Sequence, residues 1–209
     1  ILLSVLFFPI EDGVPLLPME PVQLLWINLV ATVALALPLA FEAPEPDVMS
    51  RPPRNPAAPI LSRFVLTRTA VVATLMTAGA IGLFLWEYYL ELDRGIPRET
   101  ALAEAQTMAV TTVILFQIFY LLNCRSLRDS IRAIGLFTNP TVYLGIGVLL
   151  CLQLGFVYLP FMNGLFGSAP LAADAWLAAL LVSTVVVPVI SLEKWSRRRR
   201  AAGIVSGSR

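Results

Sequence analysis

Residues 21–54 read PVQLLWINLVATVALALPLAFEAPEPDVMSRPPR, an apolar run of helix length followed by a segment rich in proline and arginine. The run holds one amide, Asn28, and one hydroxyl, Thr32, four residues apart. Four residues are about one helical turn, so we expect both side chains on one face of the helix. A polar pair on an otherwise apolar spanning helix usually points into protein rather than at lipid. The stretch therefore predicts a membrane helix with one polar face turned toward protein.

The composition of the whole chain is that of an integral membrane protein. Of 209 residues, 57% are hydrophobic and 14% are charged, and the mean hydropathy is +0.78. Soluble domains are about half apolar and about a quarter charged. The sequence shows no glycine-rich phosphate loop and no histidine, so it predicts no soluble catalytic module. Two cysteines support neither a disulfide framework nor a zinc site.

The apolar runs predict an all-α fold, an integral membrane bundle of about six transmembrane helices within residues 1–196. Residues 1–8 are too short for a bilayer core that needs ~20 residues, so we interpret them as the end of a truncated first helix. A short interfacial segment is the alternative for these residues. A proline- and arginine-rich linker is expected at 42–63 and a basic tail at 197–209, with no regular structure over 201–209. The expected spans are 1–8 (partial), 21–41, 64–90, 105–123, 140–160 and 173–192.

The positions of the basic residues predict the topology. Only Arg94 and Arg98 lie outside three groups, at 51–68, 125–132 and 194–209. By the positive-inside rule these three groups are cytoplasmic. We therefore expect a multi-pass protein of the cell membrane with a cytoplasmic C-terminus. The four arginines that follow the last apolar run indicate a topology anchor rather than a nucleic-acid site, so no nucleic-acid partner is expected.

Several polar side chains lie within the expected spans or at their ends, and two interpretations compete for them. Their oxygens can replace the hydration shell of a hard cation. They can equally form interhelical hydrogen bonds, which are worth ~1 kcal/mol each. Hydrogen bonding is the favoured interpretation for each of them except Asn28. Carboxylates are expected only at span ends, at Glu42, Glu87, Glu104 and Glu193. The polar set is Asn28, Thr32, Thr111, Thr112, Gln117, Asn123 and Gln153.

Two motifs at fixed spacing resemble a known family. PVQLLWINLV at 21–30, with FEAPEPDVMSRPPRNP at 41–56, resembles the sixth transmembrane segment and following loop of cation-transporting P-type ATPases. The calcium-pump-like type II group and its bacterial relatives are the most similar; calcium pumps read PVQLLWVNLVTDGLP there, followed by a loop of the form PPD-x-D-x-M-x-(K/R)-PPR. The loop rhythm of the whole chain further resembles the C-terminal transmembrane domain of these pumps, helices five to ten.

The resemblance implies which residues bind the transported cation. Asn28 stands at the position of the asparagine that offers a side-chain oxygen to the ion. Ala31 and Thr32 stand where calcium pumps have Thr-Asp, and Gln117 stands at the acidic ligand of the eighth helix. The candidate cation ligands are therefore Asn28, Thr32 and Gln117. Because two carboxylates are replaced, a monovalent cation or a degenerate site competes with Ca²⁺ as the interpretation.

The resemblance also implies partners outside this sequence. Arg51 and Arg54 lie in a loop that would sit against the phosphorylation domain and transmit its motion to the helices. ATP and Mg²⁺ would act on the N-terminal and cytoplasmic pump domains, present in the same chain or in a split subunit. The chain itself is expected to hold no cofactor and no ATPase catalytic residue. Its expected partners are those domains, the transported cation and the lipid bilayer.

Two functions follow. The first is the membrane domain of an ATP-driven cation pump, which works by alternating access. The second is a stand-alone or remnant membrane protein that serves as a scaffold or binds a partner without transport. The reading frame upstream of Ile1 separates them, since a DKTGT-type phosphorylation motif there supports the pump.

Overall fold

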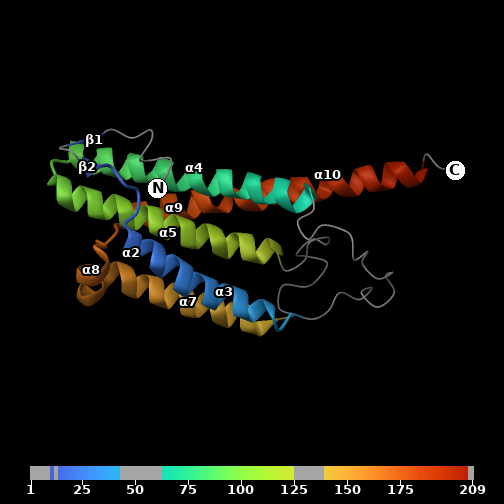
Figure 1. The fold of residues 1–209 in the computed structure, drawn as a ribbon, viewed down its shortest axis with the longest axis horizontal. Coiled ribbons are helices and arrows are strands. Elements are labelled where there is room, and N and C mark those ends of the chain that lie inside the picture. The colour runs from blue at the N-terminus through green and yellow to red at the C-terminus, as the bar shows by residue number, and fades with distance from the viewer. Residues whose placement is uncertain (1–9, 12–13, 43–62, 125–138, 207–209) are drawn as a thin grey trace.

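The computed structural model describes residues 10–11, 14–42, 63–124 and 139–206, and these form an elongated bundle of helices (Figure 1). The elements in chain order are β1 (Ile10–Glu11), β2 (Val14–Pro15), α2 (Pro21–Trp26), η1 (Ile27–Ala31), α3 (Thr32–Leu39), α4 (Arg63–Asp93), α5 (Arg98–Cys124), α7 (Pro140–Tyr158), α8 (Pro160–Phe166), α9 (Ala173–Thr184) and α10 (Val186–Ser206).

The expected fold class, an all-α membrane bundle, is confirmed. The strands among the described residues are a single antiparallel pair that places Ile10 opposite Pro15. Five helical runs in the described part of the chain are long and apolar enough to cross a membrane. They overlap the five full spans expected from the sequence, while the partial span at 1–8 and nearly all of the linker at 42–63 lie outside the described residues. The five runs are Pro21–Leu39, Val65–Asp93, Arg98–Asn123, Pro140–Tyr158 and Ala173–Ser196.

The C-terminal end differs from the expectation. We expected residues 201–209 to lack regular structure, but α10 continues through this region to Ser206. Arginine and alanine are good helix formers, and a helix that has already nucleated is extended cheaply by such residues.

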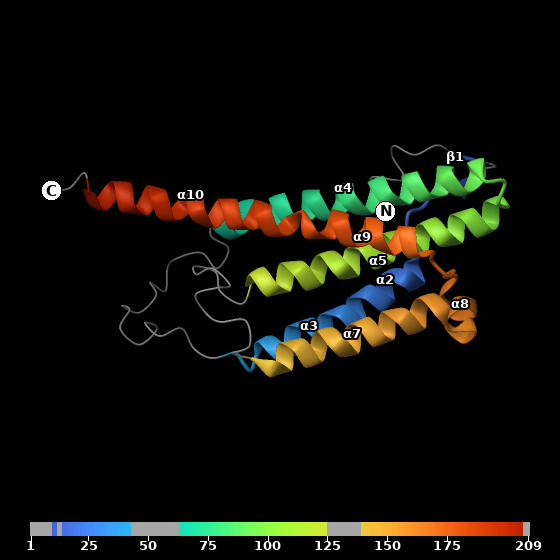
Figure 2. The same cartoon turned by 180° about the vertical axis from the view of Figure 1, so that it is seen from behind.

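Helix α5 forms the centre of the bundle. In its membrane-spanning segment, 78% of the residues are buried inside the protein, against 22–33% in the other four spanning segments of the described chain. It lies between α4, α9 and α10 on one side and α2, α3 and α7 on the other, as Figures 1 and 2 show from opposite directions. Ala101, Ala105 and Ala109 recur every four residues along α5 and are fully buried. Such small side chains let neighbouring backbones approach closely, which suits a helix surrounded by others.

The turn between α4 and α5 is tight because Gly95 adopts a left-handed conformation with φ 79°. The backbone N–H of Gly95 donates to the carbonyl of Leu92, and that of Ile96 donates to the carbonyl of Glu91. Glycine enters this conformation without a Cβ penalty, so it is well suited to end a helix in this way. The turn makes α4 and α5 an antiparallel hairpin and brings their connected ends together.

Candidate functional site

The helix that carries Asn28 is interrupted by a π turn. Residues Ile27–Ala31 form η1 between α2 and α3. Gln23, Ile27, Ala31 and Leu35 are all buried. They recur every four residues, which is longer than the 3.6-residue turn of an α-helix. The wider π turn takes up the difference and keeps these four positions toward the bundle. Such turns frequently occur at functional sites.

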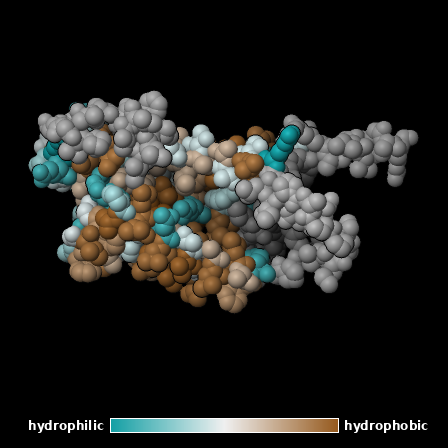
Figure 3. Space-filling view, in the orientation of Figure 1, coloured by the Kyte–Doolittle hydropathy of each residue, from teal (hydrophilic) through white to brown (hydrophobic). Residues whose placement is uncertain are grey.

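Asn28 and Thr32 lie on the opposite, exposed side of this helix. No side-chain hydrogen bond of either residue is found within the described part of the chain. Around them the exposed side chains are large and apolar, with Leu25 and Leu29 each 68% exposed and Leu37 61% exposed. Figure 3 shows a largely hydrophobic face on this side of the bundle, crossed near its middle by hydrophilic groups. Within the described structure, the polar pair therefore does not point into the protein as the sequence analysis expected.

Gln117 lies elsewhere. Its half-buried side chain lines a pocket of about 220 Å³ between α5 and α4, and no interaction joins it to Asn28 or Thr32 among the described residues. The structure thus gathers no common site from the three predicted ligands, and their role as ligands stays a prediction. Arg51 and Arg54 lie outside the described residues. The other residues of the pocket are Thr69, Val72, Ala73, Met76, Phe116 and Tyr120.

The buried face of the same helix carries a polar network instead. The indole N–H of Trp26 donates to Gln153 Oε1 at 3.2 Å, and Gln153 Nε2 donates to Thr111 Oγ1 at 3.0 Å. Gln153 and Thr111 are fully buried, and Trp26 is 8% exposed. Three helices, α2, α7 and α5, are joined by these two bonds. For Gln153 and Thr111 the hydrogen-bonding interpretation of the sequence analysis is confirmed.

The structure gives roles to two motif residues that the sequence analysis left unassigned. In PVQLLW, Trp26 stacks on Phe156 with ring centroids 5.3 Å apart, in addition to its bond to Gln153. Gln23 is fully buried and donates from Nε2 to the carbonyl of Phe166 at 3.1 Å. A glutamine and a tryptophan three residues apart in an apolar run could have signalled a buried polar contact, because such groups rarely face lipid. The motif thus anchors α2 to α7 and α8.

The far end of the helix is fixed through Pro38. Pro38 lies buried inside α3 and has no N–H to donate to the carbonyl of Ala34. Gly145 of α7 packs against this carbonyl so closely that a Cβ would collide with it and would lie 2.7 Å from a Pro38 ring carbon. Asn139 Nδ2 also donates to the Pro38 carbonyl at 3.2 Å. The helix that carries Asn28 is therefore held at both ends.

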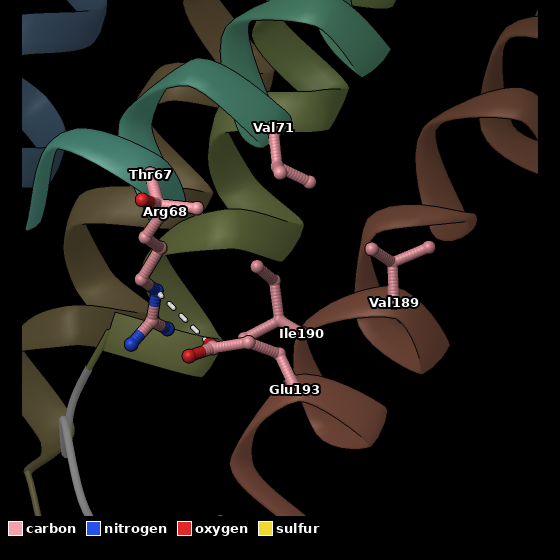
Figure 4. A pocket seen from close by; sticks show the side chains of 6 residues that line it. All are labelled: Thr67, Arg68, Val71, Val189, Ile190 and Glu193. Carbon is pink, nitrogen blue, oxygen red and sulfur yellow. Dashed lines mark ion pairs between the residues drawn. The ribbon is translucent and has the colours of Figure 1, made fainter. Parts of the chain in front are cut away.

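A second polar contact ties α4 and α5 to α10 (Figure 4). The Arg68 guanidinium lies 4.0 Å from a carboxylate oxygen of Glu193 and 5.9 Å from the centre of the Tyr120 ring. The two charged residues line a small pocket of about 70 Å³. Next to them, Lys194 Nζ donates to the carbonyl of Asn123 at 2.8 Å. A cation at the C-terminal carbonyls of a helix such as α5 is favoured by the helix dipole.

Comparison with known proteins identifies the family. The family model described as "Cation transporting ATPase, C-terminus" matches residues 16–196. Over 185 residues the chain is 39% identical to the probable cation-transporting ATPase F of Mycobacterium tuberculosis, covering 88% of this chain and 20% of that protein. It is 34% identical over 182 residues to the cation-transporting ATPase pma1 of Synechocystis sp., covering 84% of this chain and 19% of that protein.

A eukaryotic relative agrees with these. The chain is 32% identical over 183 residues to calcium-transporting ATPase 1 of Saccharomyces cerevisiae, covering 87% of this chain and 18% of that protein. The chain thus spans about a fifth of the length of the relatives it matches. Its helical bundle, its motif-bearing helix and these matches agree that the chain belongs to the C-terminal transmembrane domain family of the cation-transporting P-type ATPases.

Proposed function

We propose that the chain supplies part of the ion pathway and of the cation site of an ATP-driven cation pump in the cell membrane. The observation that carries the proposal is the exposed side of the π-interrupted helix. The side chains of Asn28 and Thr32 lie there without hydrogen bonds in the described part of the chain, on an otherwise apolar helix. Amide and hydroxyl oxygens on such a helix are costly unless another group uses them. A dehydrated cation is such a group.

The site is completed by other parts of the pump. Asn28 and Thr32 offer neutral oxygens, which do not balance the charge of a divalent cation. The exposed leucines beside them form a surface that further helices of the pump would cover. We therefore propose that carboxylates from those helices join Asn28 and Thr32, whereas Gln117 lines a pocket against α4. Relatives named as cation- and calcium-transporting ATPases support a metal cation as the cargo.

The coupling to ATP is also proposed. Alternating access requires the helices to tilt when a cytoplasmic domain is phosphorylated. The loop with Arg51 and Arg54 follows the Asn28 helix directly and would transmit that motion. ATP and Mg²⁺ would bind parts of the pump that lie outside the matched region. With the basic groups inside, the C-terminus is cytoplasmic.

The test uses the full protein that contains this chain, in lipid vesicles, with ATP hydrolysis measured against cation concentration. We expect Asn28→Ala to raise the cation concentration for half-maximal activity by about tenfold or more. Mutation of residues that only contact a metal's ligands already costs ~10–100-fold in metal affinity, and Asn28 is proposed to bind the cation directly. Val33→Ala, an exposed apolar position on the same helix, is the matched control and is expected to behave as wild type. Unchanged cation activation in Asn28→Ala would overturn the assignment of this residue.

A further inference from the structure

Three carboxylates meet at the connected ends of α4 and α5. Glu87 and Glu91 lie one turn apart on α4, and Glu104 lies on α5. One carboxylate oxygen from each residue lies within 4.8 Å of the other two. The sequence analysis placed Glu87 and Glu104 separately at span ends; the tight turn at Gly95 brings the two helix ends together. This group, the acidic triad, lies at the opposite end of α4 from Arg68.

Glu87 gives the acidic triad a feature that ordinary surface acids lack. Glu87 is only 4% exposed, and Phe84 and Tyr88 on the same helix are fully buried. Among the described residues it has neither a hydrogen bond nor an ion pair. Burial of a carboxylate without a partner is expensive, especially within a membrane-spanning helix. Its carboxylate nevertheless lies close to those of Glu91 and Glu104. A positive charge between them would offset their mutual repulsion.

Arg94 lies beside the acidic triad but forms an ion pair with only one of its three acids in the described part of the chain. Arg94 donates to Glu91 at 2.5 Å and its other terminal nitrogen lies 3.6 Å from Asp174. The hydrogen bond to Glu91 raises the pKa of Arg94 above its usual value, so Arg94 stays charged. Glu87 and Glu104 have no ion-pair partner in the described part of the chain. Arg94 is thus paired with two of these four carboxylates, Glu91 and Asp174.

We propose that Glu87, Glu91 and Glu104 bind a hard divalent cation of the Ca²⁺ class, at a site separate from Asn28. All the ligands are carboxylate oxygens, which Ca²⁺ prefers. Two oxygens bound to one Ca²⁺, each at about 2.4 Å, lie at most ~4.8 Å apart, and the three carboxylate oxygens of the acidic triad lie within that distance of one another. Glu104 is half-buried, so water can reach the site and complete the coordination. The bound cation would clamp α4 to α5 at their connected ends.

The experiment measures luminescence of Tb³⁺, a Ca²⁺ substitute, in the full protein in lipid nanodiscs. The aromatic residues Tyr88 and Tyr89 beside the acidic triad can sensitise the ion. Measurement in an Asn28→Ala background separates this site from the proposed transport site. We expect a saturable signal that Ca²⁺ displaces, and at least about tenfold weaker Tb³⁺ binding in Glu87→Gln, since even outer-shell changes cost ~10–100-fold. Glu99→Gln, an exposed acid on α5, should bind as the background protein does.

Two further measurements keep the test decisive. Glu104→Gln removes a half-buried ligand from the other helix, and it replaces Glu87→Gln if that variant does not fold by circular dichroism. Ca²⁺ should raise the thermal unfolding temperature of the background protein and leave that of the ligand variants unchanged. The proposal is overturned if Tb³⁺ gives no saturable signal that Ca²⁺ can displace at concentrations up to about 1 mM. That result is expected if the carboxyl groups share a proton and bind no metal ion. Equal weakening by Glu99→Gln would also overturn it, because diffuse charge would then explain the binding.

Discussion

The two sides of the α2–α3 helix differ in how their polar groups are satisfied. On the bundle side, Gln23 and Trp26 form hydrogen bonds to α8 and α7 and are buried. On the other side, Asn28 and Thr32 are exposed and have no side-chain hydrogen bond within the described residues. Both sides belong to one short run of sequence in one apolar helix. Polar residues in this helix therefore serve two purposes: packing on the bundle side and, as we propose, ion binding on the exposed side.

The π turn makes this division possible. A regular α-helix would rotate positions four residues apart by about 40° at each step. The buried positions 23, 27, 31 and 35 would then drift around the helix, and the exposed pair would drift with them. The π turn at Ile27–Ala31 compensates for the drift, so the packing side stays on the bundle. Stability and function are thereby assigned to separate sides, and mutations can test them separately.

The largest effect is expected where α7 packs on the helix backbone. Gly145→Ala places a methyl group against the carbonyl of Ala34 and the ring of Pro38, and a backbone atom cannot move aside cheaply. We expect the free energy of unfolding to fall by about 3 kcal/mol, the upper part of the usual range for overpacking. Gly147→Ala on the same helix meets no atom within 4 Å and serves as the control. Denaturant unfolding in detergent measures both, and equal stability of the two variants would contradict the close packing.

A smaller loss is expected from the buried network. Gln153→Ala removes the acceptor of the Trp26 indole and the donor to Thr111, and it should lower the free energy of unfolding by about 1–2 kcal/mol. Replacement of the exposed Cys151 by alanine is the control on the same helix. A double-mutant cycle with Trp26→Phe isolates the bond between the two side chains. Additive effects in that cycle would show that the bond contributes no stability.

Much of the fold is readable from the sequence because hydropathy directly reports which segments avoid water. The five full spans and the membrane class follow from it, and the family follows from the PVQLLW and RPPR motifs. The expectation that residues 201–209 lack regular structure was wrong for 201–206, because the usual disorder of chain ends was given more weight than the helix propensity of the arginines and alanines there. The π turn could not be predicted, since it depends on which side of the helix meets α5 and α7.

The candidate sites were less accessible to sequence reasoning. Hydropathy says that a polar side chain is unusual in a membrane helix, but it does not say which neighbour it meets. Gln117 illustrates this, because it lines a pocket with α4 residues, and among the described residues no interaction joins it to Asn28. The acidic triad was missed because Glu87 and Glu104 are distant in sequence and meet only through the turn at Gly95. The spacing of Glu87 and Glu91, one helical turn apart, was the signal available.

The smallest effect on stability is expected from Asn28→Ala, and this makes it the sharpest test of the contrast between the two sides. Asn28 and Gln153 are both amides on spanning helices, yet only Gln153 has hydrogen-bond partners in the described structure. The unfolding free energy of the isolated chain should therefore change by no more than ~0.5 kcal/mol in Asn28→Ala, as is usual for exposed positions. Denaturant unfolding beside Gln153→Ala provides the comparison. A loss in Asn28→Ala as large as that in Gln153→Ala would assign Asn28 to packing, and the proposal that it binds the cation would lose its structural basis.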